Sequence, residues 1–152
     1  MCGFLLGSLV EEKTKHRKED ICDLLTALDK MKRDIVFLSL PIDRIYQELS
    51  GKCRVGKMFE RISLSGEKNQ EKLWEENLNI LGTLKNEDML PILSLAKELG
   101  KGDRELSGRQ IDICMEILKK NLEKVENACN RECKLYPRLG LYGGILIIIL
   151  MM

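Results

Sequence analysis

The apolar residues of this chain recur every three to four positions over most of its length. From Glu19 to Leu38 this spacing predicts one long amphipathic helix with a polar opposite face. The predicted buried stripe is Ile21, Leu24, Leu25, Leu28, Met31, Ile35 and Leu38. The alternation of apolar and polar residues that is typical of strands is rare, so the pattern predicts an all-helical fold.

Proline, glycine and capping residues divide the remainder into five further helices. The second begins at Pro41, and Asn86 is a good N-cap for the fifth. The last begins at Asp103 or Ser107 and runs to about Lys134. The predicted helix ends are Ser50-Gly51, Ser65-Gly66, Gly82, and Gly100 with Gly102. Six helices with short polar links predict a compact bundle.

The C-terminal segment 135–152 has the composition of a membrane helix. No charged side chain occurs from Leu139 to Met152, and residues 145–150 are all aliphatic. Counted from Leu135, a helix of 18 residues is about 27 Å long, close to a hydrocarbon core of about 30 Å. A buried strand or helix is the alternative, but no second strand is predicted to pair with it. We therefore expect a C-terminal transmembrane segment, in which Gly140 and Gly144 allow another membrane helix to approach closely.

Residues 1–10 are also apolar but too few to cross a bilayer, so we interpret them as the remnant of an N-terminal membrane segment. Residues 11–134 then form a helical domain between two membrane segments. Basic residues flank both segments on the domain side, and the positive-inside rule places such a domain in the cytoplasm. These residues are Lys13, Lys15, Arg17, Lys18, Lys134 and Arg138.

Composition argues against several kinds of partner. Charged residues make up 32% of the chain, but the formal net charge is only +1, which disfavours nucleic acid as the partner. The six cysteines follow no secretory signal, so we expect reduced thiols. Cys114, Cys129 and Cys133 fall near one helix face, but small core residues explain them better than a zinc site or a metal sensor does.

No catalytic pattern is present in the sequence. Gly51–Met58 is one residue from a P-loop, yet Met58 lacks the hydroxyl that ligates magnesium, and a helix precedes the loop instead of a strand. We interpret its glycines as helix ends. His16 is the only histidine and has no predicted partner. We expect no enzyme activity, no cofactor, no metal and no small-molecule substrate.

Charged residues near two helix starts are the candidates for a partner interface. Glu87 and Asp88 fall in the first turn of the fifth helix, where the helix dipole also favours them. Asp103 and Arg104 begin the sixth helix. A charged face made by these four residues is the hypothesis for the contact with a partner.

Five segments of the sequence carry a more specific signal. They are Leu40-Pro41-Ile42, Trp74-Glu75-Glu76, Leu84–Asp88, Leu99–Glu105 and Lys134–Gly144. In this order they resemble the stage III sporulation protein AB family over nearly the whole chain. Two positions depart from the family pattern: Ser107 stands where a glutamine is usual, and Pro137 stands where a basic residue is common.

The resemblance implies a helical domain similar to the platform protein of type II secretion and type IV pilus machines. It also implies a non-enzymatic component of the channel between mother cell and forespore, in the mother-cell membrane with its domain in the cytoplasm. The implied partners are other stage III sporulation proteins, including a secretion-type ATPase, stage III sporulation protein AA. The alternative is a generic tail-anchored helical adaptor unrelated to transport.

Overall fold

The computed structural model describes the backbone of residues 2–99 and 101–151 and the side chains of residues 7, 9–99 and 101–131. These residues form six α-helices and no strand, which confirms the all-helical prediction. The helices are α1 (Cys2–Val36), α2 (Ile42–Leu49), α3 (Arg54–Ser65), α4 (Gln70–Leu81), α5 (Asn86–Leu99) and α6 (Arg104–Met151).

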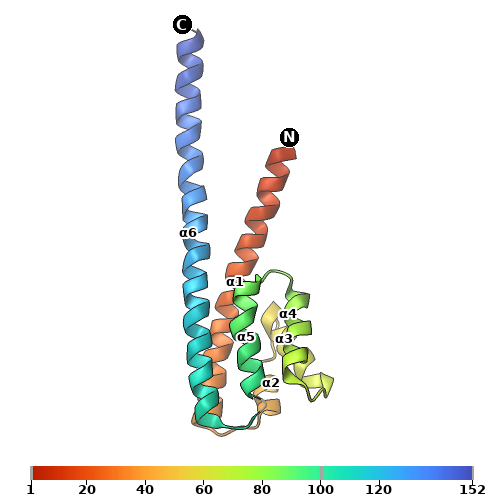
Figure 1. Cartoon of the computed structure of the whole chain (residues 1–152). Coiled ribbons are helices and arrows are strands. Elements are labelled where there is room, and N and C mark those ends of the chain that lie inside the picture. Colours follow the sequence, from red (N-terminus) through yellow and green to blue (C-terminus); the bar gives the residue numbers. More distant parts are fainter. Residues whose placement is uncertain (1, 100, 152) are drawn as a thin grey trace.

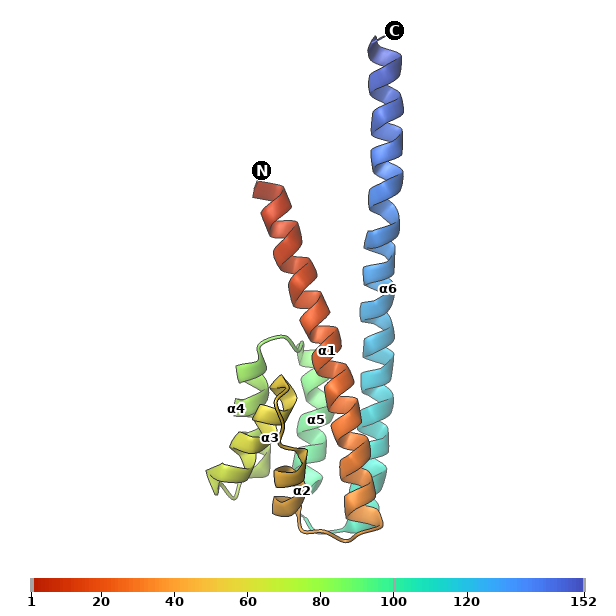
Figure 2. The same cartoon turned by 180° about the vertical axis from the view of Figure 1, so that it is seen from behind.

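Two long antiparallel helices, α1 and α6, lie side by side (Figures 1 and 2). Helix α5 packs against α6, α2 and α3 pack against α1, and α4 packs against α3 and α5. Both long helices extend past the short ones in the same direction, so the two chain termini lie toward one end of the molecule (Figure 1). We call this the proximal end. The opposite end, where α1 ends and α6 begins, is the distal end.

The core joins the predicted stripe of α1 to α5 and α6, and an aromatic cluster joins α2, α3 and α4. In this cluster the rings of Tyr46, Phe59 and Trp74 lie 5.5 to 6.0 Å apart. Trp74 Nε1 donates to the Tyr46 hydroxyl at 3.1 Å, and that hydroxyl donates to Gln70 at 2.9 Å. Burial raises the pKa of Tyr46, so the phenol keeps the proton that it donates. Packing and hydrogen bonds thus fix the three short helices together.

Most helix ends fall where the sequence predicts them. Gly66 and Gly82 follow α3 and α4 with φ of 62° and 67°, the left-handed conformation that glycine adopts without strain. The prediction for Leu38 is wrong, because α1 ends at Val36 and leaves Leu38 62% exposed. The interpretation of Gly56 as a helix end is also wrong, since Gly56 is a buried residue inside the first turn of α3.

Helix α6 runs without interruption through Pro137 to Met151. Within the residues that the structure describes, no helix is both long enough and apolar enough to cross a membrane. The predicted anchor 135–152, with Gly140 and Gly144, lies outside the residues whose side chains the structure describes. The same holds for most of the predicted N-terminal segment 1–10, whose backbone from Cys2 onward belongs to α1.

Candidate partner interface

The structure places the four predicted interface residues at opposite ends of the body. Glu87 and Asp88 lie in the first turn of α5, at the proximal end, whereas Asp103 and Arg104 lie where α6 begins, at the distal end (Figure 1). The 14 residues of α5 separate the two pairs by about 20 Å. They do not form one charged face.

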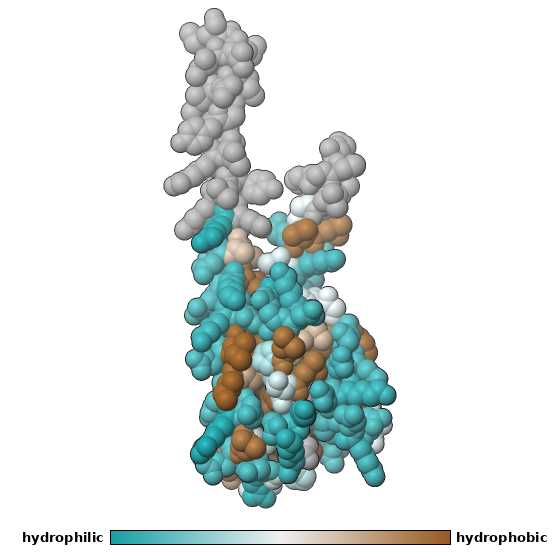
Figure 3. All heavy atoms as spheres, in the orientation of Figure 1, coloured by the Kyte–Doolittle hydropathy of each residue, from teal (hydrophilic) through white to brown (hydrophobic). Residues whose placement is uncertain are grey.

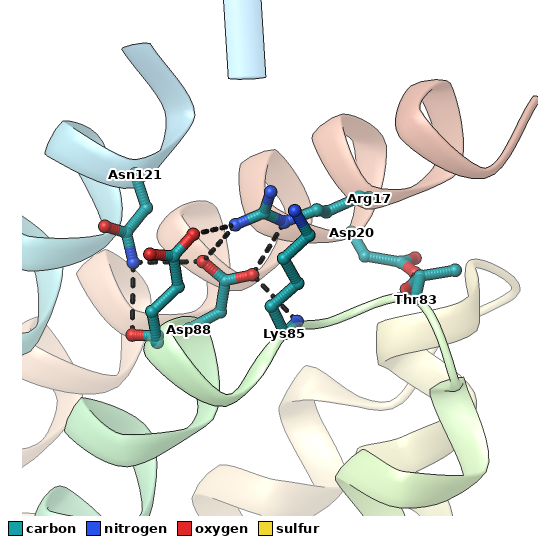
Figure 4. Close-up of polar contacts among 7 residues, drawn as sticks. Arg17, Asp20, Thr83, Lys85, Asp88 and Asn121 are labelled. Carbon is teal, nitrogen blue, oxygen red and sulfur yellow. Dashed lines mark hydrogen bonds and ion pairs between the residues drawn. The ribbon is translucent and has the colours of Figure 1, made fainter. Parts of the chain in front are cut away.

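Asp88 is fully buried, and donors from two other helices and a loop surround its carboxylate (Figure 4). Arg17 of α1 donates from Nε at 2.8 Å and from Nη2 at 3.0 Å. Asn121 of α6 donates at 3.0 Å. The backbone N–H of Lys85, directly before α5, donates at 3.1 Å, as in a capping box. Asp88 therefore joins helices inside the fold and offers no surface to a partner.

Glu87 is exposed but shares the same arginine, accepting from Arg17 Nη2 at 2.8 Å. Its backbone carbonyl accepts from Asn121 at 3.1 Å. Burial disfavours the charge of Arg17, but hydrogen bonds and charge from Asp88 and Glu87 outweigh this and raise its pKa. The guanidinium therefore stays charged, and it binds both carboxylates to α1.

Arg17 and Asn121 were not predicted as buried residues, although the sequence carries a signal for both. Arg17 continues the stripe of Ile21, Leu24 and Leu28 by one helical step. Asn121 lies between the buried Leu118 and Val125 of α6 in the same way. A polar residue at a core position of an amphipathic helix indicates a buried polar contact.

A second buried carboxylate lies beside this network. Asp20, on the turn of α1 after Arg17, is 1% exposed. It accepts a hydrogen bond from the Thr83 hydroxyl in the loop between α4 and α5, and it pairs with Arg54 Nη1 at 3.3 Å. Arg54 also donates to the carbonyl of Leu81, the last residue of α4. These contacts hold the α4–α5 loop against α1.

Asp103 and Arg104 are both exposed, and each stabilises the distal end. Asp103 Oδ1 accepts from the backbone N–H groups of Glu105 at 3.1 Å and Leu106 at 3.2 Å, which makes it the N-cap of α6. Arg104 Nη1 donates to the Ser39 hydroxyl at 2.7 Å and so ties the start of α6 to the loop after α1. Both side chains still face solvent.

A cavity of about 1010 Å³ lies at the distal end, and we call it the distal groove. Asp103 and Arg104 line it, together with part of the loop after α1. Phe37 and Leu38, which directly precede that part of the loop, are exposed. Exposed apolar side chains beside charged ones are typical of protein interfaces. Further lining comes from Ser39, Leu40, Pro41, Ile42, Asp43, Gly66, Glu67, Lys68 and Gly102.

Apolar side chains also reach solvent on the flank formed by α5 and α6, as brown atoms on the teal surface (Figure 3). Ile113 and Ile117 are one turn apart on α6 and are 50% and 37% exposed. Leu90 on α5 is 66% exposed. This flank is a second surface with interface character.

The described residues hold no group of three or more His, Cys, Asp or Glu side chains placed to bind a metal. Burial raises the pKa of Cys114 to about 12, so its thiol stays protonated. The Nδ1 atom of the single histidine, His16, lies 3.3 Å from Glu19 Oε2 on the same helix. His16 Nε2 also lies 3.7 Å from Glu12 Oε1, so the ring contacts two glutamates of its own helix.

Comparison with known protein families gives a match over the full sequence. The family model of stage III sporulation protein AB matches residues 1–152, the full sequence. No curated protein and no solved structure matches.

Proposed function

Since this chain belongs to the stage III sporulation protein AB family, we propose that it is a non-enzymatic, membrane-anchored platform of the channel between mother cell and forespore. Family membership makes it a sporulation protein. The finer role, the mother-cell membrane location and the cytoplasmic position of the domain are the proposal.

One observation carries it: α1 and α6 leave the body in the same direction (Figure 1). The described backbone of both apolar segments, residues 2–10 and 135–151, therefore lies toward the proximal end. A single bilayer at that end would receive both of them. The distal end would then face the cytoplasm, which supports a body that presents one end to a soluble partner.

The partner that we propose for the distal groove is the secretion-type ATPase, stage III sporulation protein AA. The groove lies at the end farthest from the two apolar segments (Figure 1). Phe37, 76% exposed, and Leu38 provide apolar anchors, and Asp103 and Arg104 provide charge.

The test removes the contact surface and keeps the fold. Asp103→Asn keeps a good N-cap without the charge, and Arg104→Gln keeps a hydrogen-bond donor for Ser39. Phe37→Ser and Leu38→Ser remove exposed apolar area only. The full chain in nonionic detergent is used to pull down the ATPase. We expect the fourfold variant to bind at least about tenfold more weakly.

The matched control is Leu64→Ser with Ile80→Ser, which removes exposed apolar area from α3 and α4. Control binding should equal that of the unchanged chain. Equal binding by the fourfold variant would reject the distal groove as the contact. In cells, deletion of the gene should arrest sporulation after engulfment, whereas a generic tail-anchored adaptor predicts no such stage-specific block.

A further inference from the structure

A second cavity, of about 440 Å³, lies at the proximal end where α1, α6 and the loop before α5 meet. Its charged lining is Lys13, Arg17, Lys85 and Lys124, with Glu87 as the only acidic residue. We propose that this cavity, the basic pocket, binds a phosphate group.

The basic pocket concentrates positive charge in a chain that is nearly neutral overall, with a formal net charge of +1. Lys13, Lys85 and Lys124 are exposed, and none has a carboxylate within 4.0 Å among the described residues. Other lysines of the same helices are paired: Lys18 lies 3.1 Å from Glu126, and Lys32 lies 2.7 Å from Asp112. Three cations without a paired carboxylate therefore line one cavity.

Arg17 supplies a fixed donor to the same cavity. Its Nε and Nη2 are engaged by Asp88 and Glu87, but Nη1 has no hydrogen-bond partner among the described residues. Nη1 is also accessible to solvent. Among the described residues, the one side-chain nitrogen or oxygen that is both buried and without a hydrogen-bond partner is Asp34 Oδ2. In Figure 4 the side chain of Lys85 extends alongside the guanidinium.

These groups suit a phosphate oxygen better than a carboxylate or a neutral ligand. A guanidinium N–H and ammonium groups form short, charge-assisted hydrogen bonds to phosphate. The arginine is already held in place by two carboxylates, with Asp88 fully buried beneath it. Only the lysines must lose side-chain freedom on binding, which lowers the cost of forming the complex.

The phosphate group has two possible sources, an anionic lipid headgroup and free phosphate. The basic pocket lies at the proximal end with both apolar segments, so the lipid source rests on the proposed membrane anchor (Figure 1). The phosphate chemistry of the pocket does not depend on that anchor. An assay with soluble short-chain lipid tests phosphate binding by the pocket separately from membrane anchoring of the chain.

The experiment uses the full chain in nonionic detergent at constant ionic strength. Thermal unfolding is followed while short-chain phosphatidylglycerol, short-chain phosphatidylcholine or inorganic phosphate is added. The variant Lys13→Gln/Lys85→Gln/Lys124→Gln empties the pocket of exposed cations. The control Lys52→Gln/Lys57→Gln/Lys97→Gln makes the same charge change at exposed lysines that do not line the pocket.

We expect a saturable rise in Tm with phosphatidylglycerol and none with phosphatidylcholine, because binding to the folded state raises Tm. The pocket variant should raise the apparent Kd at least about tenfold, and the control variant should match the unchanged chain. Tighter binding of phosphatidylglycerol than of phosphate assigns the lipid source, and the reverse order assigns free phosphate. The proposal is overturned if neither ligand gives a saturable shift, or if both triple variants lose binding equally.

Discussion

Asp88 is the residue at which the three longest packed elements of the body meet. Each carboxylate oxygen has two donors: Oδ1 accepts from Arg17 and Asn121, and Oδ2 accepts from Arg17 and the Lys85 backbone. Four donors offset the large cost of removing a charge from water. Loss of the arginine would leave the charge of Asp88, which has no exposed surface, without a counter-charge.

Arg17→Met is accordingly expected to destabilise the chain by about 3–5 kcal/mol. Urea unfolding of the full chain in nonionic detergent, followed by the fluorescence of the single, buried Trp74, measures this. The control is Arg33→Met, whose partner Asp29 is exposed on the same helix, and which should cost less than about 1 kcal/mol. Similar losses of unfolding free energy in both variants would mean that the buried Arg17–Asp88 pair stabilises the fold no more than the exposed Arg33–Asp29 pair does.

Asp23 gives a prediction for pH. Burial raises its pKa, and the nearby charges of Asp20 and Glu19 add to the effect. The folded state therefore holds the proton more tightly than the unfolded state does, so the stability that Asp23 contributes is present at low pH. This contribution is lost as pH rises through the raised pKa. Asp23→Asn should thus gain stability relative to the unchanged chain as the pH rises above about 4. If the difference in unfolding free energy between Asp23→Asn and the unchanged chain stayed constant with pH, the raised pKa of Asp23 would be contradicted.

At the scale of elements, short-range signals were enough for α2, α3 and α4. A glycine in the left-handed conformation follows both α3 and α4, and each helix is short enough for its own stripe to define its buried face. The end of α1 differs from the prediction because the apolar spacing continues to Leu38, past the last helical residue Val36 and up to the turn at Ser39, where φ is 54°. Periodicity describes a face and does not locate the turn that ends it.

In the segment Gly51–Met58, which is one residue from a P-loop, Gly56 allows a close backbone contact. A Cβ built there would lie 2.7 Å from the backbone nitrogen of Gly51, so the start of α3 packs directly against the backbone at the beginning of the loop that follows α2. Gly56→Ala should destabilise the chain by about 1–3 kcal/mol, because backbone atoms must move. Gly51→Ala meets nothing within 4 Å and should change stability by less than about 1 kcal/mol. Urea unfolding of both variants measures the contrast, and equal values would show that the contact relaxes without cost.

At the scale of the whole molecule, the candidate site was only partly accessible from the sequence. Asp103 and Arg104 are at the surface as expected, but Asp88 is internal and Glu87 belongs to the other end. Their separation follows from α5 running between the two ends, which no local pattern encodes. The basic pocket is equally non-local, since Lys13, Lys85 and Lys124 are brought together by the packing of α1, α6 and a loop.

The common direction of α1 and α6 gives a prediction about the orientation of the molecule in the cell. If both apolar segments enter the mother-cell membrane from its cytoplasmic side, as proposed, the whole body lies in the cytoplasm, and Cys53 at the start of α3 is an exposed thiol there. A membrane-impermeant maleimide should leave Cys53 unlabelled in intact protoplasts and label it after permeabilisation, as read by peptide mass spectrometry.

Cys114 is an internal control: it is buried, and its raised pKa of about 12 keeps the thiol protonated. It should react only after denaturation in either preparation. Labelling of Cys53 in intact protoplasts would place the body outside the cytoplasm, and the distal groove could then not meet an ATPase that works inside the cell.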